Sequence, residues 1–393
     1  MCFLNTKFFP IGGTAIRTLN FARAIKDRKN GVRIITWQPT DDYPDEKKVS
    51  DLVREGICVD IAKVNHQVLK KHFRFLYVLS LGLQYSIFVG KIVKEEETDV
   101  VHCVNETIWI GALIKKILKK PVVADIHATP SIAVDDFLPA AKNVLPQFLS
   151  KTALRIAAKF IDGFMCPTEE LRDLLISWGL PSRKVKTITN AMFIPENLKK
   201  SKAKIRAELG LDEETTLIAF HGNLTTHYNI DALRCLSRIS RIVSKDLRKV
   251  KFLVMGYYEK VPVADANFIY TGYVEDLRGY INAADFAVVP IFENSLGIRS
   301  RLLDYFAMSI PVLTTPVGVT GMKFAQESGA VIVRNNIEEL AQSTVELASS
   351  QEKIKEMAEK SRKLIKWFSP ERTARILLSF YSQVIQEWQS HHK

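Results

Sequence analysis

Two arginines and an aspartate lie around the start of one short predicted helix, and these residue types can bind a phosphorylated ligand. Arg299 and Arg301 flank the first position of an amphipathic segment over residues 300–308, which follows a loop containing Gly297. The first N–H groups of a helix have no intrahelical partner and carry partial positive charge, so they attract phosphate. Asp304, one turn further on, can accept hydrogen bonds from ribose hydroxyls. An ordinary crossover unit with solvated arginines is the alternative.

Two glycine-containing turns follow predicted strands, one in each half of the chain. Gly12 and Gly13 separate an apolar N-terminal segment from a helical pattern, and Gly222 and Asn223 repeat this arrangement directly after His221. Glycine lets a ligand approach the backbone closely while the following helix offers its N–H groups. Neither turn has the GxGxxG or GxxxxGK spacing of dinucleotide and ATP sites. A tight turn that needs glycine only for its own conformation is the alternative.

One histidine stands at the predicted end of a buried strand. His127 follows the apolar segment 121–126, and the carboxyl ends of parallel strands border the ligand cleft in doubly wound folds. Imidazole can bind a polar substrate group there, or transfer a proton near neutral pH. A structural histidine is the alternative. His102 is the weaker candidate, because Cys103 and Val104 continue its strand.

The elements that must position these residues alternate between short apolar runs and amphipathic helical segments. Unbroken β-branched runs mark strands buried on both faces, as in parallel sheets covered by helices. The chain therefore predicts an α/β protein with two doubly wound, Rossmann-like domains around a central cleft. The first domain comprises residues 1–192 with about 370–393, and the second comprises residues 193–369. The predicted strands include residues 34–37, 100–104, 122–126, 163–167, 185–188, 217–220, 252–255, 268–270, 287–289, 312–314 and 331–333.

Length, charge and cysteine use narrow the class of protein. A chain of 393 residues with 47% hydrophobic residues exceeds what one core usually supports, which favours two globular domains. The 55 Lys and Arg exceed the 43 Asp and Glu, and the resulting net charge of +12 suits an anionic partner. The five cysteines stand singly, without zinc-ligand spacing, and indicate no metal site and a reducing, cytoplasmic setting.

An anionic membrane surface is one candidate for this partner. The segment 70–77 mixes basic and aromatic residues on a predicted helix that can lie on such a surface, whereas a helix that merely covers the sheet is the alternative. The apolar tract 75–89 is shorter than the ~20 residues that cross a bilayer. Residues 1–10 lack the pattern of a secretory leader. No zinc-finger, RRM or helix-turn-helix signature indicates nucleic acid.

Short motifs in one collinear order over most of the chain resemble those of a known enzyme family. Any single match is weak, but their shared order resembles the retaining GT-B glycosyltransferases, and within them family 4. The resemblance implies the same GT-B fold. The segments that carry it are residues 9–13, 99–102, 124–127, 166–171, 184–190, 272–277, 284–290 and 302–312.

The resemblance implies a nucleotide-sugar donor bound mainly by the second domain and a glycan or lipid-linked acceptor bound mainly by the first. It places Asp304 at the ribose hydroxyls, and His127 at the sugar near its reacting carbon. The expected catalytic residues are His127, Arg299 and Arg301. The expected substrate-binding residues are Gly12, Gly13, Gly222, Asn223, Glu293, Asn294, Gly297, Ile298 and Asp304. Arginines that neutralise the leaving diphosphate imply transfer without a metal or other cofactor, and the family implies retention.

The sequence departs from the family's pattern at four positions, one of which is Asp304, where the family has the longer glutamate. Leu296 stands where the family has an acidic residue, so Glu293 or Asn294 is the expected substitute. Asn223 and Tyr228 stand where the family has an arginine and a lysine. These departures leave open a same-fold epimerase or phosphorylase, and a non-catalytic homologue that binds a nucleotide sugar. A nicotinamide oxidoreductase is disfavoured because its GxGxxG is absent.

Overall fold

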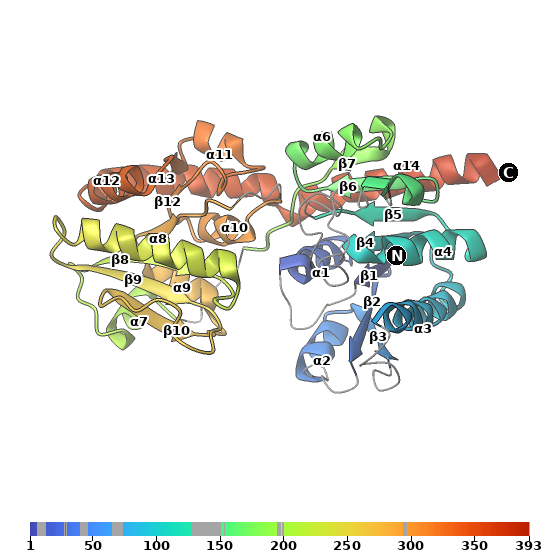
Figure 1. The fold of residues 1–393 in the computed structure, drawn as a ribbon, viewed down its shortest axis with the longest axis horizontal. Helices are drawn as coiled ribbons and strands as arrows, with labels where there is room; N and C mark the ends of the chain where they lie inside the picture. Colours follow the sequence, from blue (N-terminus) through green and yellow to red (C-terminus); the bar gives the residue numbers. More distant parts are fainter. Residues whose placement is uncertain are drawn as a thin grey trace. The chain divides into compact units, whose positions relative to one another are not determined.

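The structure is a computed structural model that separates into two units, each built on one parallel sheet (Figure 1). Unit 1 contains Met1–Ala191 and Pro370–Lys393, and unit 2 contains Met192–Ser369. Met192, expected in the first domain, belongs to unit 2, where its N–H donates to the Phe368 carbonyl at 2.8 Å. The described residues are 1–5, 13–26, 28, 30–39, 46–64, 74–127, 151–152, 154–194, 198, 200–293 and 297–392.

Unit 1 contains a seven-stranded parallel sheet in the order β3-β2-β1-β4-β5-β6-β7. Its strands are β1 (Cys2–Asn5), β2 (Arg33–Pro39), β3 (Cys58–Val64), β4 (Val101–Val104), β5 (Val122–Asp125), β6 (Gly163–Cys166) and β7 (Val185–Thr187). The central strands are buried because helices cover both faces of the sheet. Its helices are α1 (Gly13–Lys26), α2 (Glu46–Arg54), α3 (Arg74–Glu95), η1 (Asn105–Thr107), α4 (Ile108–Leu118), α6 (Glu169–Ser177), η3 (Ser182–Lys184) and α14 (Pro370–His392).

Unit 2 contains a six-stranded parallel sheet in the order β10-β9-β8-β11-β12-β13. Its strands are β8 (Thr216–His221), β9 (Val250–Met255), β10 (Phe268–Gly272), β11 (Phe286–Val289), β12 (Val312–Thr314) and β13 (Val331–Val333). Its helices are α7 (Lys202–Glu208), α8 (His227–Val243), α9 (Leu277–Ala283), α10 (Ser300–Ala307), α11 (Lys323–Glu327), α12 (Ile337–Ala348), α13 (Gln351–Leu364) and η4 (Ile365–Phe368). The predicted doubly wound α/β architecture is thus confirmed in both units.

The strand order brings distant parts of the sequence together. In unit 2, β8 lies beside β11, so the turn after His221 lies close to the loop that leads from β11 into α10. In unit 1, β4 lies between β1 and β5, so the ends of three strands meet around the residues that follow β5. In each sheet this is the point where the direction of chain winding reverses, which is the usual ligand position in doubly wound folds.

The apolar-run criterion missed one strand, and part of another predicted strand is not tested. β3 lies at the sheet edge, and polar residues such as Asp60 and Lys63 interrupt its apolar pattern. An edge strand has one solvated side and needs no unbroken apolar run. β1 covers Cys2–Asn5, and the rest of the apolar N-terminal segment before Gly12, which the sequence predicts as a strand over residues 3–9, lies outside the described residues. Among the described helices, none is long and apolar enough to cross a bilayer.

Candidate active site

In unit 2, the guanidinium of Arg301 lies across the end of β8. Its Nη2 donates to Oδ1 of Asn229 at 2.6 Å, and its Cζ lies 4.9 Å from the centroid of the Phe220 ring, a cation–π distance. Asn229 is held in turn, because its Nδ2 donates to the Asn223 carbonyl at 2.7 Å. Burial lowers the pKa of Arg301, but an arginine stays charged at any physiological pH. The result is a fixed, partly desolvated cation.

Gly222 makes this arrangement sterically feasible. A Cβ at residue 222 would lie 2.8 Å from Nη2 of Arg301 and 3.0 Å from Nδ2 of Asn229. The neighbouring Gly256 has φ +136°, and a Cβ there would lie 1.8 Å from the Gly222 carbonyl oxygen. Two glycines on adjacent strand ends therefore let the backbones and the guanidinium pack together. The predicted glycine turn has a structural reason that involves Arg301 directly.

Asp304 and His221 form a second pair in the same cluster. Nε2 of His221 lies 3.6 Å from Oδ2 of Asp304, whose side chain is 21% exposed. Burial raises the pKa of Asp304 to about 6, although Arg278 and Arg301 act to lower it. Burial, together with Arg301, lowers the pKa of His221 to about 3. At neutral pH the pair is therefore a neutral imidazole beside a carboxylate that is close to its titration range.

Three buried polar atoms around α10 lack a hydrogen-bond partner among the described residues. They are Nη1 of Arg301, Nε of Arg299 and Nε2 of His221. Buried donors in native proteins are nearly always satisfied by protein, water or ligand. Two of these atoms belong to guanidinium groups, which donate preferentially to phosphate and carboxylate oxygens. The cluster thus has the chemistry of an anion-binding site.

The loop that precedes α10 is only partly described. Arg299 is the N-cap residue of α10 without a side-chain cap, and its Nη2 donates to the Glu293 carbonyl at 3.0 Å. The Glu293 carboxylate lies 3.1 Å from Nε2 of His227 at the exposed start of α8. Gly297 is buried and Ile298 is half-buried. Asn294 and Leu296 lie outside the described residues. That Glu293 or Asn294 takes the place of the family's acidic residue at position 296 therefore stays a prediction.

In unit 1, His127 is bound to a buried carboxylate. Its Nε2 lies 2.8 Å from Oδ2 of Asp125, which is 1% exposed. Two nitrogens of Arg17 donate to the two oxygens of the same carboxylate, at 2.9 and 3.1 Å. Burial acts to raise the pKa of Asp125, but the charge of Arg17 and the interactions with the two histidines outweigh it and hold this pKa well below its usual value. Asp125 is therefore an ionised acceptor.

The Arg17–Asp125 pair is fixed by further contacts. Arg17 also donates to Oδ1 of Asn190 at 2.5 Å and to the Ile188 carbonyl at 2.8 Å, and its guanidinium lies 4.4 Å from the Phe21 ring centroid. A buried carboxylate that is held this firmly can orient a neighbouring imidazole.

His102 and Tyr381 complete this network from the opposite side. Nε2 of His102 lies 3.5 Å from Oδ2 of Asp125, and its Nδ1 lies 2.5 Å from the hydroxyl of Tyr381 in α14. Burial lowers the pKa of His102 and raises that of Tyr381, so both groups are neutral. His102 is 1% exposed, which leaves it as an internal link between α14 and the carboxylate.

The contact with Asp125 defines the tautomer of His127. Because an ionised carboxylate only accepts hydrogen bonds, Nε2 of His127 carries the proton, and in the neutral ring Nδ1 is left as an acceptor. The backbone N–H of His127 donates to Oδ1 of Asn105 at 3.0 Å, which fixes the start of the following loop. The imidazole thus offers one hydrogen-bond acceptor, and its side chain is 10% exposed.

The other residues that the sequence analysis singled out lie in different places. Gly12 lies outside the described residues, and Gly13 is the first residue of α1. Asn223 is exposed, and its Oδ1 accepts from the Thr225 N–H at 3.1 Å. Tyr228 is half-buried in the first turn of α8. Within the described residues no group of His, Cys, Asp or Glu could hold a metal ion.

Sequence reasoning missed Arg17, Asp125, Asn190 and Asn229 as members of these two clusters. Asp125 had a recognisable signal, since it is a charged residue at the end of an otherwise apolar, fully buried strand. Such a carboxylate needs a partner, and a cation on a helix that covers the sheet was the group to seek. Asn229 has no comparable signal in the sequence.

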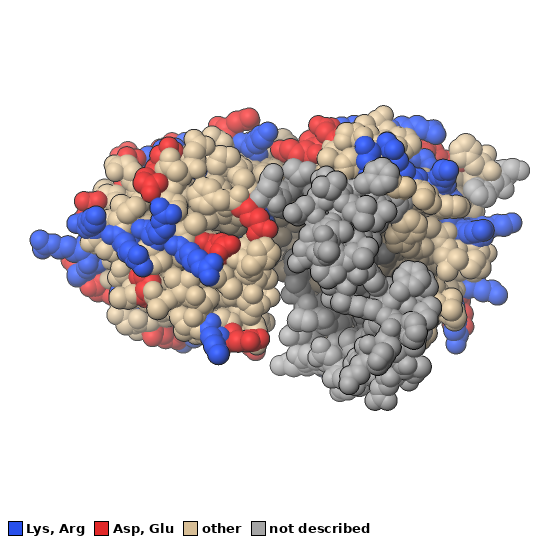
Figure 2. All heavy atoms as spheres, viewed as in Figure 1, with Lys and Arg blue, Asp and Glu red and all other residues tan. Residues whose placement is uncertain are grey.

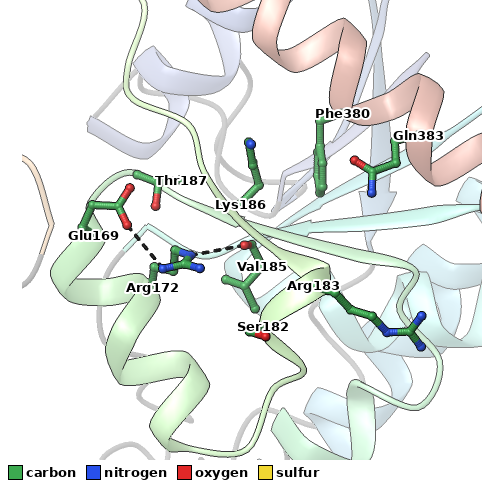
Figure 3. A pocket seen from close by; sticks show the side chains of 9 residues that line it. All are labelled: Glu169, Arg172, Ser182, Arg183, Val185, Lys186, Thr187, Phe380 and Gln383. Carbon is green, nitrogen blue, oxygen red and sulfur yellow. Dashed lines mark hydrogen bonds and ion pairs between the residues drawn. The ribbon is translucent and has the colours of Figure 1, made fainter.

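A separate hollow of about 600 Å³ lies beside the edge strand β7 (Figure 3). Nε of Arg172 donates to the Val185 carbonyl at 3.4 Å, and the same side chain lies 3.5 Å from Glu169. None of the predicted site residues lines this hollow. Its lining residues are Glu169, Arg172, Ser182, Arg183, Val185, Lys186, Thr187, Phe380 and Gln383.

The fold and the two clusters define a class of protein, the GT-B type with two Rossmann-like domains. Residues 11–192 match the family described as Glycosyltransferase Family 4, and residues 215–350 match Glycosyl transferases group 1. Together the two matches span most of both units. The chain belongs to the family-4, group-1 glycosyltransferases.

Individual proteins agree with this family. A D-inositol 3-phosphate glycosyltransferase of Rhodococcus jostii is 23% identical over 332 residues, 77% of this chain and 71% of that protein. An alpha-monoglucosyldiacylglycerol synthase of Streptococcus pneumoniae is 26% identical over 241 residues, but these span 57% of this chain and only 53% of the relative. The structure of Anabaena HepE in complex with UDP and glucose has a TM-score of 0.74 at 15% identity, covering 97% of this chain and 99% of that one. At this identity the structural match shows the fold alone.

Proposed function

We propose that this protein transfers a sugar from a nucleotide-sugar donor to a glycan or lipid-linked acceptor, with retention of configuration and without a metal ion. Unit 2 binds the nucleotide sugar, and unit 1 binds the acceptor and contacts the transferred sugar. The observation that carries the proposal is the α10 cluster, in which Arg299 and Arg301 keep unsatisfied donors beside Asp304.

The leaving group determines the role of the α10 cluster. In transfer, the bond between the anomeric carbon and a diphosphate oxygen breaks, and negative charge builds up on the diphosphate. Arg301 is already held by Asn229 and Phe220, so it can stabilise this charge without reorganising. Arg299 and the N–H groups after Gly297, at the start of α10, supply further donors. Asp304 accepts hydrogen bonds from the ribose hydroxyls.

His127 determines the role of unit 1. Its Nδ1 accepts a hydrogen bond from a hydroxyl of the transferred sugar, because Asp125 holds the proton on Nε2. The acceptor hydroxyl forms the new bond to the anomeric carbon on the face from which the diphosphate leaves, and its proton passes to the departing phosphate oxygen. The relatives named above include one glycosyltransferase of an inositol phosphate and one synthase of a glycosylated diacylglycerol, and the second supports a lipid-linked acceptor.

Product analysis tests this proposal. The protein is incubated with UDP-, GDP- and ADP-sugars and a mixture of glycan and lipid acceptors, with and without EDTA. We expect a glycoside with the donor's anomeric configuration, formed equally in both conditions. An epimerised nucleotide sugar would identify an epimerase, and binding without any product would identify a non-catalytic homologue. Complete loss of activity in EDTA, restored by magnesium or manganese, would contradict metal-independent transfer.

A further inference from the structure

A stripe of large apolar side chains lies on the outer face of α4. Trp109, Leu113 and Ile117 are 47%, 38% and 65% exposed, and their spacing of four residues places them on one side of the helix. The opposite side is buried against the sheet, where a Cβ on Gly111 would lie 2.3 Å from Sγ of Cys103. The stripe therefore points away from the core of unit 1.

α3 continues this stripe. Leu83 and Ile87 are 58% and 66% exposed, whereas Tyr85 and Val89 on the other side are buried. α3 and α4 pack against each other. α3 connects β3 to β4 and α4 connects β4 to β5, so both connections run in the same direction across the sheet. Right-handed crossovers then place both helices on one face of the sheet, parallel to each other. We call Leu83, Ile87, Trp109, Leu113 and Ile117 the α3–α4 face.

Basic residues border the α3–α4 face at the C-terminal ends of the two helices. Lys116 on α4 and the C-cap residue Lys119 are exposed, Lys120 is half-buried, and none of them has an ion pair within the described part of the chain. Lys91 and Lys94 are exposed near the end of α3. Where α4 ends in Figure 1, Figure 2 shows basic side chains at the margin of unit 1.

Acidic residues at this end offset the lysines only in part. Glu95, Glu96 and Glu97 follow at the end of α3, where Glu95 lies 3.9 Å from Lys91 and Glu96 pairs with Arg33 at 2.9 Å. Unit 1 as a whole has 31 Lys and Arg against 22 Asp and Glu, which is +9 of the chain's net +12. The α3–α4 face therefore combines an apolar centre with a basic border on the more basic unit.

We propose that the α3–α4 face docks on an anionic lipid bilayer. Leu83, Ile87, Leu113 and Ile117 enter the boundary between headgroups and acyl chains, the Trp109 ring lies at headgroup level, and the lysines contact lipid phosphates. A second copy of the chain fits this surface less well, because a two-fold contact through it would bring the two basic borders together. Docking through this face does not involve the α10 cluster, so it stands or fails independently of the proposed function.

Vesicle sedimentation tests this proposal. The full chain is mixed with phosphatidylglycerol-rich vesicles and with pure phosphatidylcholine vesicles at low and high salt. We expect strong binding to the anionic vesicles, weakened by salt. Leu113→Glu with Ile117→Glu should reduce this binding at least about 10-fold, since charges then replace the apolar centre. Replacing Lys116, Lys119 and Lys120 by Gln should lower it by about fivefold per lysine, the equivalent of about 1 kcal/mol each.

Two controls separate the outcomes. Tyr257→Glu with Val261→Glu changes exposed apolar residues of unit 2, and Arg301→Ala changes the α10 cluster; both variants should bind vesicles as the unmodified chain does. Circular dichroism confirms that each variant is folded. Negligible binding to both vesicle types would overturn the proposal, as would full binding by the Leu113→Glu, Ile117→Glu variant. If the unmodified chain is a dimer and the Leu113→Glu, Ile117→Glu variant is a monomer, the face binds a second copy of the chain instead.

Discussion

Arg301 shows how a residue can be committed to ligand binding before any ligand arrives. Its guanidinium is packed against Phe220 and Asn229, and Gly222 leaves the space that it occupies. Holding a partly desolvated cation with an unsatisfied Nη1 costs stability unless an anion binds there. This arrangement favours a ligand with concentrated negative charge, such as a diphosphate.

The first prediction follows from this arginine. Arg301→Ala should weaken binding of a nucleoside diphosphate by roughly 1.5–3 kcal/mol, the range of a charge-assisted hydrogen bond. Titration calorimetry with UDP, GDP and ADP measures the change. Arg238→Ala is the matched control, because Arg238 lies in the same unit and forms only an exposed pair with Glu338 at 3.4 Å. Equal affinity of the Arg301 variant and the control would remove Arg301 from the site.

The second prediction concerns His127, whose substitution should affect catalysis but not nucleotide binding. His127→Ala should lower kcat by about 10- to 1000-fold, while nucleoside diphosphate affinity stays within a few fold, because the nucleotide is assigned to unit 2. Single-turnover transfer and thermal unfolding are measured together. His127→Gln retains an N–H that can donate to Asp125 and so controls for lost packing. If either variant is stably folded and turns over normally, the histidine is structural.

Asp304 gives a pH-dependent stability with a defined sign. Its pKa is about 6 in the folded chain against an ordinary 3.8, so between these values the folded state holds the proton more tightly than the unfolded state. Stability therefore falls as pH rises from about 4 to about 6 and then levels off, with a total of roughly 2–3 kcal/mol. Asp304→Asn should remove this loss and make the protein more stable above about pH 6.

The test compares the stability of Asp304→Asn with that of the unmodified chain at each pH, because the pH dependence of the unmodified chain alone contains a second contribution. His221 has a pKa of about 3 in the folded chain, so its contribution to stability rises with pH over the same range and opposes that of Asp304. The difference in unfolding free energy, measured with urea for Asp304→Asn and the unmodified chain, isolates the carboxyl. A constant difference from about pH 4 to about pH 7 would contradict the raised pKa.

At the scale of elements, the sequence predicts what is local. The helix over Ser300–Ala307 has an amphipathic pattern, and the strand over Phe286–Val289 is an unbroken apolar run. Both match the predicted segments closely. Arg299, Arg301 and Asp304 belong to one helix start, so their proximity follows from helical geometry alone. The edge strand β3 lacks such a pattern because only part of its surface is buried.

Contacts across the sheet could not be predicted in this way. Arg17 and Asp125 are 108 residues apart in the sequence, and Arg301 and Asn229 are 72 residues apart. Such pairs exist only because β1, β4 and β5, and likewise β8 and β11, are neighbours in their sheets. Strand order depends on the packing of the whole unit, which local periodicity does not report.

At the scale of the whole molecule, unit 2 is an insertion in the sequence of unit 1. The chain leaves unit 1 after Ala191 and returns at Pro370 to form α14, which packs along α1. Leu377, Phe380 and Tyr381 are buried in the core of unit 1, whereas no residue of α14 belongs to the core of unit 2. In β6, a Cβ on Gly163 would lie 2.7 Å from Cζ of Phe380, so this glycine makes room for α14. α14 is therefore part of the core of unit 1 and not of the core of unit 2.

The last prediction concerns a chain that ends at Ser369. Loss of α14 removes four buried side chains from the core of unit 1, namely Leu377, Phe380, Tyr381 and Val384. Burial of each such side chain contributes roughly 1.5–3 kcal/mol, so their loss approaches the whole stability of a typical domain. Unit 1 should therefore unfold and turnover should be lost, while unit 2 keeps its core and binds a nucleoside diphosphate within a few fold of the full chain. Titration calorimetry and thermal unfolding measure both effects. Gly163→Leu, which crowds α14 without removing it, should weaken unit 1 in the same direction. Loss of nucleotide binding in the shortened chain, or turnover that survives, would show that the donor site is not confined to unit 2.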